Sequence, residues 1–225
     1  MQVTHAIRER RSIRAFHPDP VPTEVVRHLL DLSRWAPSWG NSQDWNAYVV
    51  DGSALEVMKA AFQQLAEENA PVAPDLPRPP QEWPAYLAAR MNFPRPSVEA
   101  GTAPASGAAA GPLALWGAPT LVLFAIDPAL EPTYACFDAG LIVQTFCLAA
   151  EDCGYATCIM AMPVRYADIL HGLLPQAEGQ RFVIGIALGQ ADRDSIINRG
   201  ERKRVEADEW ATFVSDVGGP ATPLG

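Results

Sequence analysis

The chain has 225 residues, of which 17 are basic and 26 acidic, so its formal net charge is −9. A general nucleic-acid binder needs a surplus of basic residues to contact phosphates, and this composition excludes that class. Any anion-binding site must therefore be local. The 48% hydrophobic content is that of a globular protein, and the length allows one large domain or two small ones.

Neither a membrane span nor a secretion signal is expected. No run of about 18 apolar residues lacks a charge or a helix breaker. The N-terminal sequence up to Phe16 carries charges where a signal peptide needs its apolar stretch. We therefore expect a cytoplasmic protein that has no membrane partner.

The cysteines and histidines do not predict a metal site. Four of each are present, and the cysteines have no C-x-x-C spacing while the histidines are scattered. Free cysteine in an apolar stretch behaves as a small hydrophobic residue, so we interpret the cysteines as structural. They are Cys136, Cys147, Cys153 and Cys158.

The first third of the chain predicts three helices and one strand. A short helix is expected over residues 3–9, and a second begins at Thr23, a potential N-cap, and ends before Pro37. Residues 46–50 are typical of a strand. Ser53 and Glu56 have the spacing of a capping box, which predicts a third helix that reaches about residue 68.

Residues 71–112 interrupt this pattern with many prolines and a stretch rich in Ala, Gly and Ser. A short helix over residues 81–93 would present Trp83, Tyr86 and Phe93. Long excursions of this kind are usually lids or linkers without structure. The three aromatic residues favour a lid, and a structureless insertion is the alternative.

The second half alternates strands and helices. Residues 120–126 form a continuous apolar run, as expected of a strand that is covered on both faces. We expect helices over 134–153 and 164–174, with Gly154 in a left-handed cap, and strands over 155–159 and 181–188. This order predicts a layered α/β or α+β fold. The tail, 189–225, is irregular and contains Trp210 and Phe213, which a partner subunit could bury.

Two short basic runs stand out in this acidic chain. Arg10 and Arg14 share one face whether the segment is helical or extended, and Ser12 joins them if it is extended. Their repulsion would be relieved by a phosphate, which arginine binds through charge-assisted hydrogen bonds. A second basic run covers residues 199–204. We interpret the two runs as converging on one small anionic ligand, the alternative being a solvated basic surface.

Residues 36–45, Ala-Pro-Ser-Trp-Gly-Asn-Ser-Gln-Asp-Trp, form a loop between a helix and a strand. Its hydroxyls, amides and backbone could hydrogen-bond a planar heterocycle, with Trp39 as an apolar wall. The alternative is a plain turn, because Ser, Asn and Gly are common turn residues. Sequence motifs of triad hydrolases, phosphate-loop enzymes, dinucleotide folds and zinc proteases are absent.

These segments together resemble the FMN-dependent nitroreductase family. The matching strings are Ala6-Ile7-x-x-Arg10-Arg11-Ser12-Ile13-Arg14-x-Phe16, Ala36-Pro37-Ser38-x-Gly40-Asn41-Ser42-Gln43-x-Trp45, the helical stretch from Asp138 to Tyr155, the strand and flavin loop from Tyr155 to Met160, and Asn198 to Arg204. Apart from residues 71–112, the resemblance covers nearly the whole chain in order.

The resemblance implies an α+β, three-layer sandwich with a mixed, mostly antiparallel sheet, in one domain over residues 1–225. It also implies an intertwined homodimer with two FMN sites, in which a C-terminal arm, residues 205–225, adds a strand to the partner's sheet. That exchange would bury Trp210 and Phe213.

The family's site residues transfer to positions in this chain. Arg10, Arg11, Ser12 and Arg14 would hold the FMN phosphate, ribityl chain and pyrimidine edge, with Arg202 and Arg204 completing the phosphate site. Ser38, Trp39, Gly40 and Asn41 would border the ring from the other subunit, and Gln144 would reach it from the long helix. Backbone groups of Ile159 and Met160 would lie near the reactive nitrogen of the flavin. Trp39, Trp83, Tyr86 and Phe93 are the expected walls of the substrate pocket.

The implied activity is a ping-pong reduction of nitroaromatic compounds to nitroso and hydroxylamine products, with NAD(P)H as the electron donor. No catalytic side chain is assigned, because the flavin loop lacks the glutamate found in some members. Asp44 also replaces the proline that usually precedes the tryptophan. The alternatives are another chemistry on the same fold (reductive dehalogenase, ene or quinone reductase, flavin-fragmenting enzyme), or a flavin carrier without enzymatic activity.

Overall fold

The computed structural model describes residues 2–77, 79–80, 82–91 and 111–215. Its four strands are β1 (Trp45–Asp51), β2 (Thr120–Ile126), β3 (Ala156–Met160) and β4 (Arg181–Gly189). They form one sheet in the order β1-β2-β4-β3, and every pair is antiparallel. Parallel pairing to this sheet, within the described chain, is limited to the bridge between Ser12 and Thr157 on the outer edge of β3. The predicted α+β class is confirmed, with an antiparallel core.

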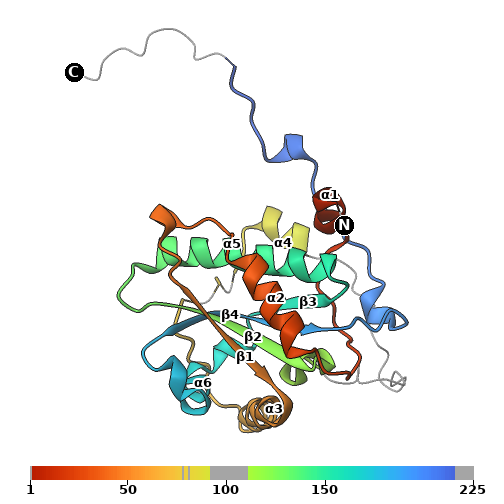
Figure 1. Ribbon diagram of the computed structural model, residues 1–225. Helices are drawn as coiled ribbons and strands as arrows, with labels where there is room; N and C mark the ends of the chain where they lie inside the picture. The colour runs from red at the N-terminus through yellow and green to blue at the C-terminus, as the bar shows by residue number, and fades with distance from the viewer. Residues whose placement is uncertain (1, 78, 81, 92–110, 216–225) are drawn as a thin grey trace, which may run out of the picture.

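Helices cover both faces of this sheet (Figure 1). Helices α2 (Thr23–Ser33) and α5 (Pro132–Asp152) lie on one face, and α3 (Gly52–Glu67) and α6 (Ala167–Leu173) lie on the other. The fully buried strand β2 directs Leu121 and Leu123 toward α3 and α6, and Val122 and Phe124 toward α2 and α5. Side chains of a strand alternate between faces, so two covered faces explain why the whole run is apolar.

Two helix starts differ from the sequence prediction. The amides of Val25 and Val26 both donate to the carbonyl of Pro22, so α2 begins at Thr23 and its N-cap is Pro22, which has no side-chain acceptor. Helix α3 begins at Gly52 with Asp51 as N-cap, and no capping box forms. Glu56 instead pairs with Lys59 at 2.9 Å, one turn along the helix.

Helix α5 runs across the same face of the sheet as α2 and carries several residues of the candidate site. The Glu131 carboxylate caps its start by accepting from the amide of Thr133 at 2.8 Å, and Gly154 follows its end with a φ of 81°. By length and composition alone this helix could cross a membrane. Its apolar character is explained by packing, because it lies between β2 and α2.

The remaining elements are short. Helix α1 (Val3–Glu9) is confirmed at its predicted position, and α4 (Ala85–Met91) lies within the helix predicted over 81–93. Residues 81 and 92–110 lie outside the described chain. The segment predicted as one helix over 164–174 is a 3-10 turn followed by α6. The 3-10 turns are η1 (Trp39–Asn41), η2 (Pro112–Gly117), η3 (Pro163–Arg165), η4 (Pro175–Ala177), η5 (Ile196–Asn198) and η6 (Ala207–Glu209).

Candidate functional site

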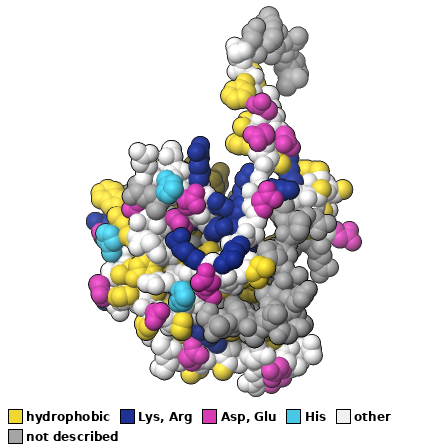
Figure 2. Space-filling model, turned by 90° about the vertical axis from the view of Figure 1, so that its right-hand side faces the viewer, with side chains coloured by type: hydrophobic (Ala, Val, Ile, Leu, Met, Phe, Trp, Pro, Cys, Tyr) yellow, Lys and Arg dark blue, Asp and Glu magenta, His cyan; other side chains and the backbone are white. Residues whose placement is uncertain are grey.

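The two basic runs of the sequence lie against each other. The Arg11 guanidinium donates to the carbonyl of Gly200, and the Arg202 guanidinium donates to the carbonyls of Arg8 and Arg10. Figure 2 shows Lys and Arg side chains gathered on one face, beside the projecting C-terminal tail. The fold therefore brings together two cationic segments that are nearly 200 positions apart in the chain, with the segment ends bonded through backbone carbonyls.

The side chain of Asn198 connects the segment 198–204 to the segment 8–14 and its neighbour Ala15 through hydrogen bonds. Its side chain is buried, and its amide nitrogen donates to the carbonyls of Ala15, at 2.9 Å, and Asp192, at 2.8 Å. Its amide oxygen accepts from the backbone N–H of Arg14 at 2.7 Å. This one buried side chain thus holds the backbone of Arg14 and Ala15 close to the backbone of Asp192.

The basic segment 10–14 has two differently placed sides. Arg11 and Ile13 line a cavity, and the backbone of the segment is extended, with a φ of −50° and a ψ of 125° at Arg10 and a bridge between Ser12 and Thr157 of β3. Burial raises the pKa of Cys158. The positive charge of Arg14, a side-chain hydrogen bond with Ser12 and the positive charge of Arg10 each lower it. The alternation is that of extended backbone, in which neighbouring side chains point to opposite sides. Arg10, Ser12 and Arg14 therefore share one surface, and Arg11 lies on the other.

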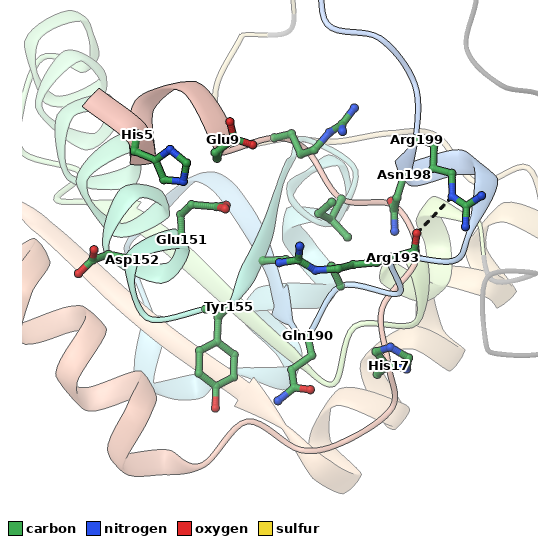
Figure 3. Close-up of a pocket in the computed structure, with 15 residues that line it drawn as sticks. His5, Glu9, His17, Glu151, Asp152, Tyr155, Gln190, Arg193, Asn198 and Arg199 are labelled. Atoms are coloured by element: carbon green, nitrogen blue, oxygen red, sulfur yellow. Dashed lines mark hydrogen bonds between the residues drawn. The ribbon is translucent and has the colours of Figure 1, made fainter. Parts of the chain in front are cut away.

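The cavity beside Arg11 has a volume of about 640 Å³ and a lining of mixed charge (Figure 3). Glu151 and Arg193 extend toward each other across it. Burial raises the pKa of the Glu151 carboxyl, and the Arg193 charge is the main opposing influence. Acidic side chains of α1 and α5 line this cavity, so it offers less positive charge than the surface that Arg10 and Arg14 share.

The outer edge of β3 lies next to this surface. Thr157 accepts a hydrogen bond from the amide of Ile13 at 3.0 Å, and beyond it the described chain places no strand on that edge. Backbone groups of an antiparallel strand point to alternate edges, so the Ile159 amide points outward, as Thr157 does. Met160 lies opposite Gly185 of β4 and its side chain is buried. The amide of Ile159 is therefore directed toward this edge, and its carbonyl accepts from the thiol of Cys158 at 3.9 Å.

The loop at residues 38–43 lies elsewhere, against α5. The backbone N–H of Trp39 donates to the buried Asp138 carboxylate at 2.7 Å, and its ring lies 5.0 Å from that of Tyr134. Gly40 and Asn41 have φ values of 56° and 62°. No hydrogen bond or ring contact among the described residues joins this loop to the basic segments. Within one chain, the predicted site residues thus form two groups.

Replacing Asp138 by leucine is expected to lower the free energy of unfolding by about 1–3 kcal/mol, because the amide of Trp39 then loses its acceptor in a partly buried position. Asp138→Asn, which keeps an acceptor oxygen, should cost less. Urea denaturation measures both. Asp31→Asn, at an exposed ion pair with Arg34, is the control and should change stability by less than about 0.5 kcal/mol. Equal losses in the two Asp138 variants would contradict the role of this bond.

Other predicted residues are more dispersed. Gln144 is exposed on α5, on the same helical face as the exposed Phe137. Trp83 and Tyr86 are exposed near α4, where Arg90 lies 5.7 Å from the centre of the Tyr86 ring. Neither aromatic residue lines a cavity described here, and Phe93 lies outside the described residues. The substrate walls predicted from residues 81–93 stay a prediction.

A second cavity, of about 590 Å³, begins where β3 ends. Its lining comes from residues 74–79, the start of α5, the 161–165 turn and β4. The described lining residues are Pro74, Leu76, Pro77, Pro79, Pro132, Thr133, Cys136, Ala161, Val164, Arg165, Phe182, Val183 and Ile184. Within the described chain, no group of three or more His, Cys, Asp or Glu side chains is placed to hold a metal ion.

Comparison with known proteins identifies the fold and the family. The model of the nitroreductase family matches residues 7–190, which include the first basic segment, the 36–45 loop, α5 and β3. The chain belongs to the nitroreductase family. Nitroreductase NfnB of Mycolicibacterium smegmatis is 31% identical over 215 residues, which cover 92% of this chain and 90% of that protein.

Other relatives of this nitroreductase-family chain align over almost their full length. The 4-nitrobenzoate reductase of Pseudomonas putida is 28% identical over 217 residues, 92% of this chain and 93% of that protein. A crystal structure of the FMN-dependent nitroreductase NfnB from Mycobacterium smegmatis in complex with NADPH has a TM-score of 0.81 at 27% identity. It aligns with 94% of this chain and 97% of its own chain.

Sequence reasoning named Asn198 and Asp138 only as parts of motifs and missed what each side chain does. A buried polar residue must find hydrogen-bond partners, and here the partners are backbone groups far away in sequence. Arg165 was not singled out at all. The only sequence signal for it is a cation that follows Pro163 at the end of a buried strand, and that signal does not show the cavity it lines.

Proposed function

We propose that this member of the nitroreductase family is an FMN-dependent oxidoreductase that uses NAD(P)H to reduce nitroaromatic compounds to nitroso and hydroxylamine products. One observation carries the proposal. The segments 8–14 and 198–204 converge through Asn198, Arg11 and Arg202 beside the open edge of β3, in a chain whose family includes FMN-dependent nitroreductases.

The residues present fit the phosphate of FMN. Arg10, Ser12 and Arg14 share one surface, and Arg202 and Arg204 belong to the segment bonded against it. Guanidinium groups and a hydroxyl are the donors that a phosphate dianion needs, and arginine can bind it in bidentate fashion. Arg11, directed toward the other side, braces the 198–204 segment through Gly200. We assign Arg11 this supporting role beside the phosphate.

The flavin ring is proposed to extend from this phosphate site along the outer edge of β3. The outward amide of Ile159 would then donate to the ring, next to the position of Met160. When bound, FMN would supply the hydride-transfer chemistry between NAD(P)H and the acceptor. The protein's own contribution is to align planar molecules against the ring and to hold charge on it through fixed donors. No side-chain acid in 159–161 serves as a proton donor.

We propose that a second copy of the chain completes each site. Its Ser38, Trp39, Gly40 and Asn41 would border the ring, and Gln144 would face it from α5. Two observations support this. Within one chain the loop has no hydrogen bond to the basic segments, and Tyr134 and Phe137 are exposed beside it on α5. Trp210 and Phe213, which belong to the C-terminal arm and are 70% and 84% exposed, would be covered by the partner subunit when the arms are exchanged.

The direct test combines purified protein, FMN and NADPH with a nitroarene under anaerobic conditions. We expect a yellow protein, FMN-dependent loss of NADPH absorbance, and hydroxylamine as the product identified by chromatography. Lack of FMN binding would overturn the proposal. Flavin that binds but is reduced only slowly by NAD(P)H in a stopped-flow trace would indicate a carrier, and turnover of a halogenated phenol without nitro reduction would indicate a different chemistry.

A further inference from the structure

The second cavity is continuous with the proposed flavin edge. Ala161, which lines it, is the residue directly after Met160, the last residue of β3. Strand β3 pairs with residues 185–189 of β4, and no other strand of the described residues lies on the edge of β4 at Phe182 to Ile184 on that side. The cavity occupies this space. An occupant would therefore lie beside the end of the strand to which we assign the flavin ring.

Residues 74–79 form the cavity wall that faces β4, and hydrogen bonds hold this wall in position. Ala73 donates to the carbonyl of Arg165 at 2.9 Å and accepts from the amide of Ala167 at 3.2 Å. The Asp75 carboxylate accepts from the amide of Phe182 at 2.8 Å and pairs with His171 at 3.1 Å. Both anchors flank Pro74. The prolines of this wall add stiffness because their φ angles are fixed. The shape of the cavity is thus set by hydrogen bonds of the fold.

The chemistry of the lining is specific. Proline, leucine, valine, isoleucine and phenylalanine side chains supply most of it, and Arg165 is the one charged residue among the described lining residues. Within the described chain, no acidic side chain pairs with the Arg165 guanidinium. An apolar cavity with a single cation at an exposed position suits a flat apolar ligand that carries one negative charge, since guanidinium and carboxylate form bidentate hydrogen bonds.

We propose that this cavity receives the electron acceptor and that Arg165 selects aromatic acceptors bearing a carboxylate. This inference rests on the proposed nitroreductase function. The aromatic ring would lie among Val183, Ile184 and the prolines, with its carboxylate at Arg165 and its reducible group toward Ala161 and the flavin edge. Arg165 is then a specificity-determining residue rather than part of the flavin site.

The test compares two acceptors that differ only in charge, 4-nitrobenzoate and 4-nitrobenzamide. In the wild-type holoenzyme, 4-nitrobenzoate should have the lower KM. Arg165→Gln should raise the KM for 4-nitrobenzoate by about 10-fold, as expected from the loss of one charge-assisted hydrogen bond. Its KM for 4-nitrobenzamide should change by less than about twofold. Arg165→Lys keeps the charge but not the planar guanidinium, so its KM for 4-nitrobenzoate should lie between those of the wild type and Arg165→Gln.

The control variant is Arg27→Gln, which removes an equal charge from the exposed side of α2, and Arg27 does not line this cavity. It should leave both KM values unchanged. The KM for NADPH is measured in parallel, because an anionic group of the dinucleotide is the other possible partner of Arg165. A rise in that KM alone, or equal changes for both acceptors, would overturn the inference.

Binding of benzoate by calorimetry gives a readout that is independent of turnover. Wild-type holoenzyme should bind benzoate, and Arg165→Gln should bind it about 10-fold more weakly. Equal affinities would refute the role of Arg165 even if nitroarenes are reduced. If neither nitroarene is reduced while benzoate still binds in an Arg165-dependent manner, the proposed function fails and the anion-selective cavity stands.

Discussion

Replacing Arg10 and Arg14 together by glutamine is expected to weaken FMN binding by about 100-fold or more. A hydrogen bond to a charged group contributes about 1.5–3 kcal/mol, and each 1.4 kcal/mol is a factor of ten in affinity. The two side chains share the surface next to Ser12 and β3, so both would contact the same phosphate. Quenching of FMN fluorescence on titration with apoprotein measures the affinity.

The matched control for this pair is Arg27→Gln with Arg34→Gln on α2, where both arginines are exposed. It changes the net charge of the protein equally and should leave FMN affinity within about twofold, because exposed charges beyond a Debye length are screened. Equal weakening in the two double variants would show that the overall field of the protein, rather than a local phosphate site, controls flavin binding.

Asn198→Ala is expected to lower the free energy of unfolding by about 2–4 kcal/mol and to weaken FMN binding at the same time. The substitution removes the acceptor of the Arg14 amide and two hydrogen bonds to the carbonyls of Ala15 and Asp192, although the Ala15 carbonyl still accepts from the amide of Asp192 at 3.0 Å. A buried unsatisfied group costs about 1–3 kcal/mol. Urea denaturation of the FMN-free protein separates the loss of folding stability from the stabilisation that a bound ligand gives.

Two further variants sharpen this prediction. Asn198→Asp keeps an acceptor for the Arg14 amide but sets a carboxylate against two carbonyl oxygens, so it should be at least as damaging as alanine. Asn46→Ala is the control, since Asn46 is exposed and makes a single side-chain bond, to Gln180 at 2.8 Å. If Asn198→Ala unfolds like the control, the link between the two basic segments is unimportant for stability.

Hydrophobic pattern predicted the layered core well. The apolar run at 120–126 and the long helix ending at Gly154 were both found, because burial on one or two faces imposes a local repeat that the sequence records. Helix starts were less certain. Thr23 and Ser53 are good caps by residue type, yet the N-caps are Pro22, one residue earlier, and Asp51, two residues earlier, which local propensity does not determine.

The site was predictable only where a linear motif carried it. The two basic runs were recognised as partners from charge alone, and their contact is present in the fold. The sidedness of Arg11 was not predictable, because it depends on the extended conformation that Ser12 adopts beside Thr157. The cavity at Arg165 joins elements about 90 positions apart, whose meeting no single stretch of sequence encodes.

Asn198 also sets the order in which the site can be assembled. The backbone of Arg14 and the Asn198 side chain that bonds it are 184 positions apart. The first arginines to be synthesised therefore gain this support only when nearly all of the described chain has been made. Contacts of such long sequence separation slow folding, because the entropy of closing the loop is lost before the contact forms. A chain that ends before Asn198 would therefore carry these arginines without the proposed phosphate site, and capture of flavin would report that synthesis has passed the last strand of the sheet, β4.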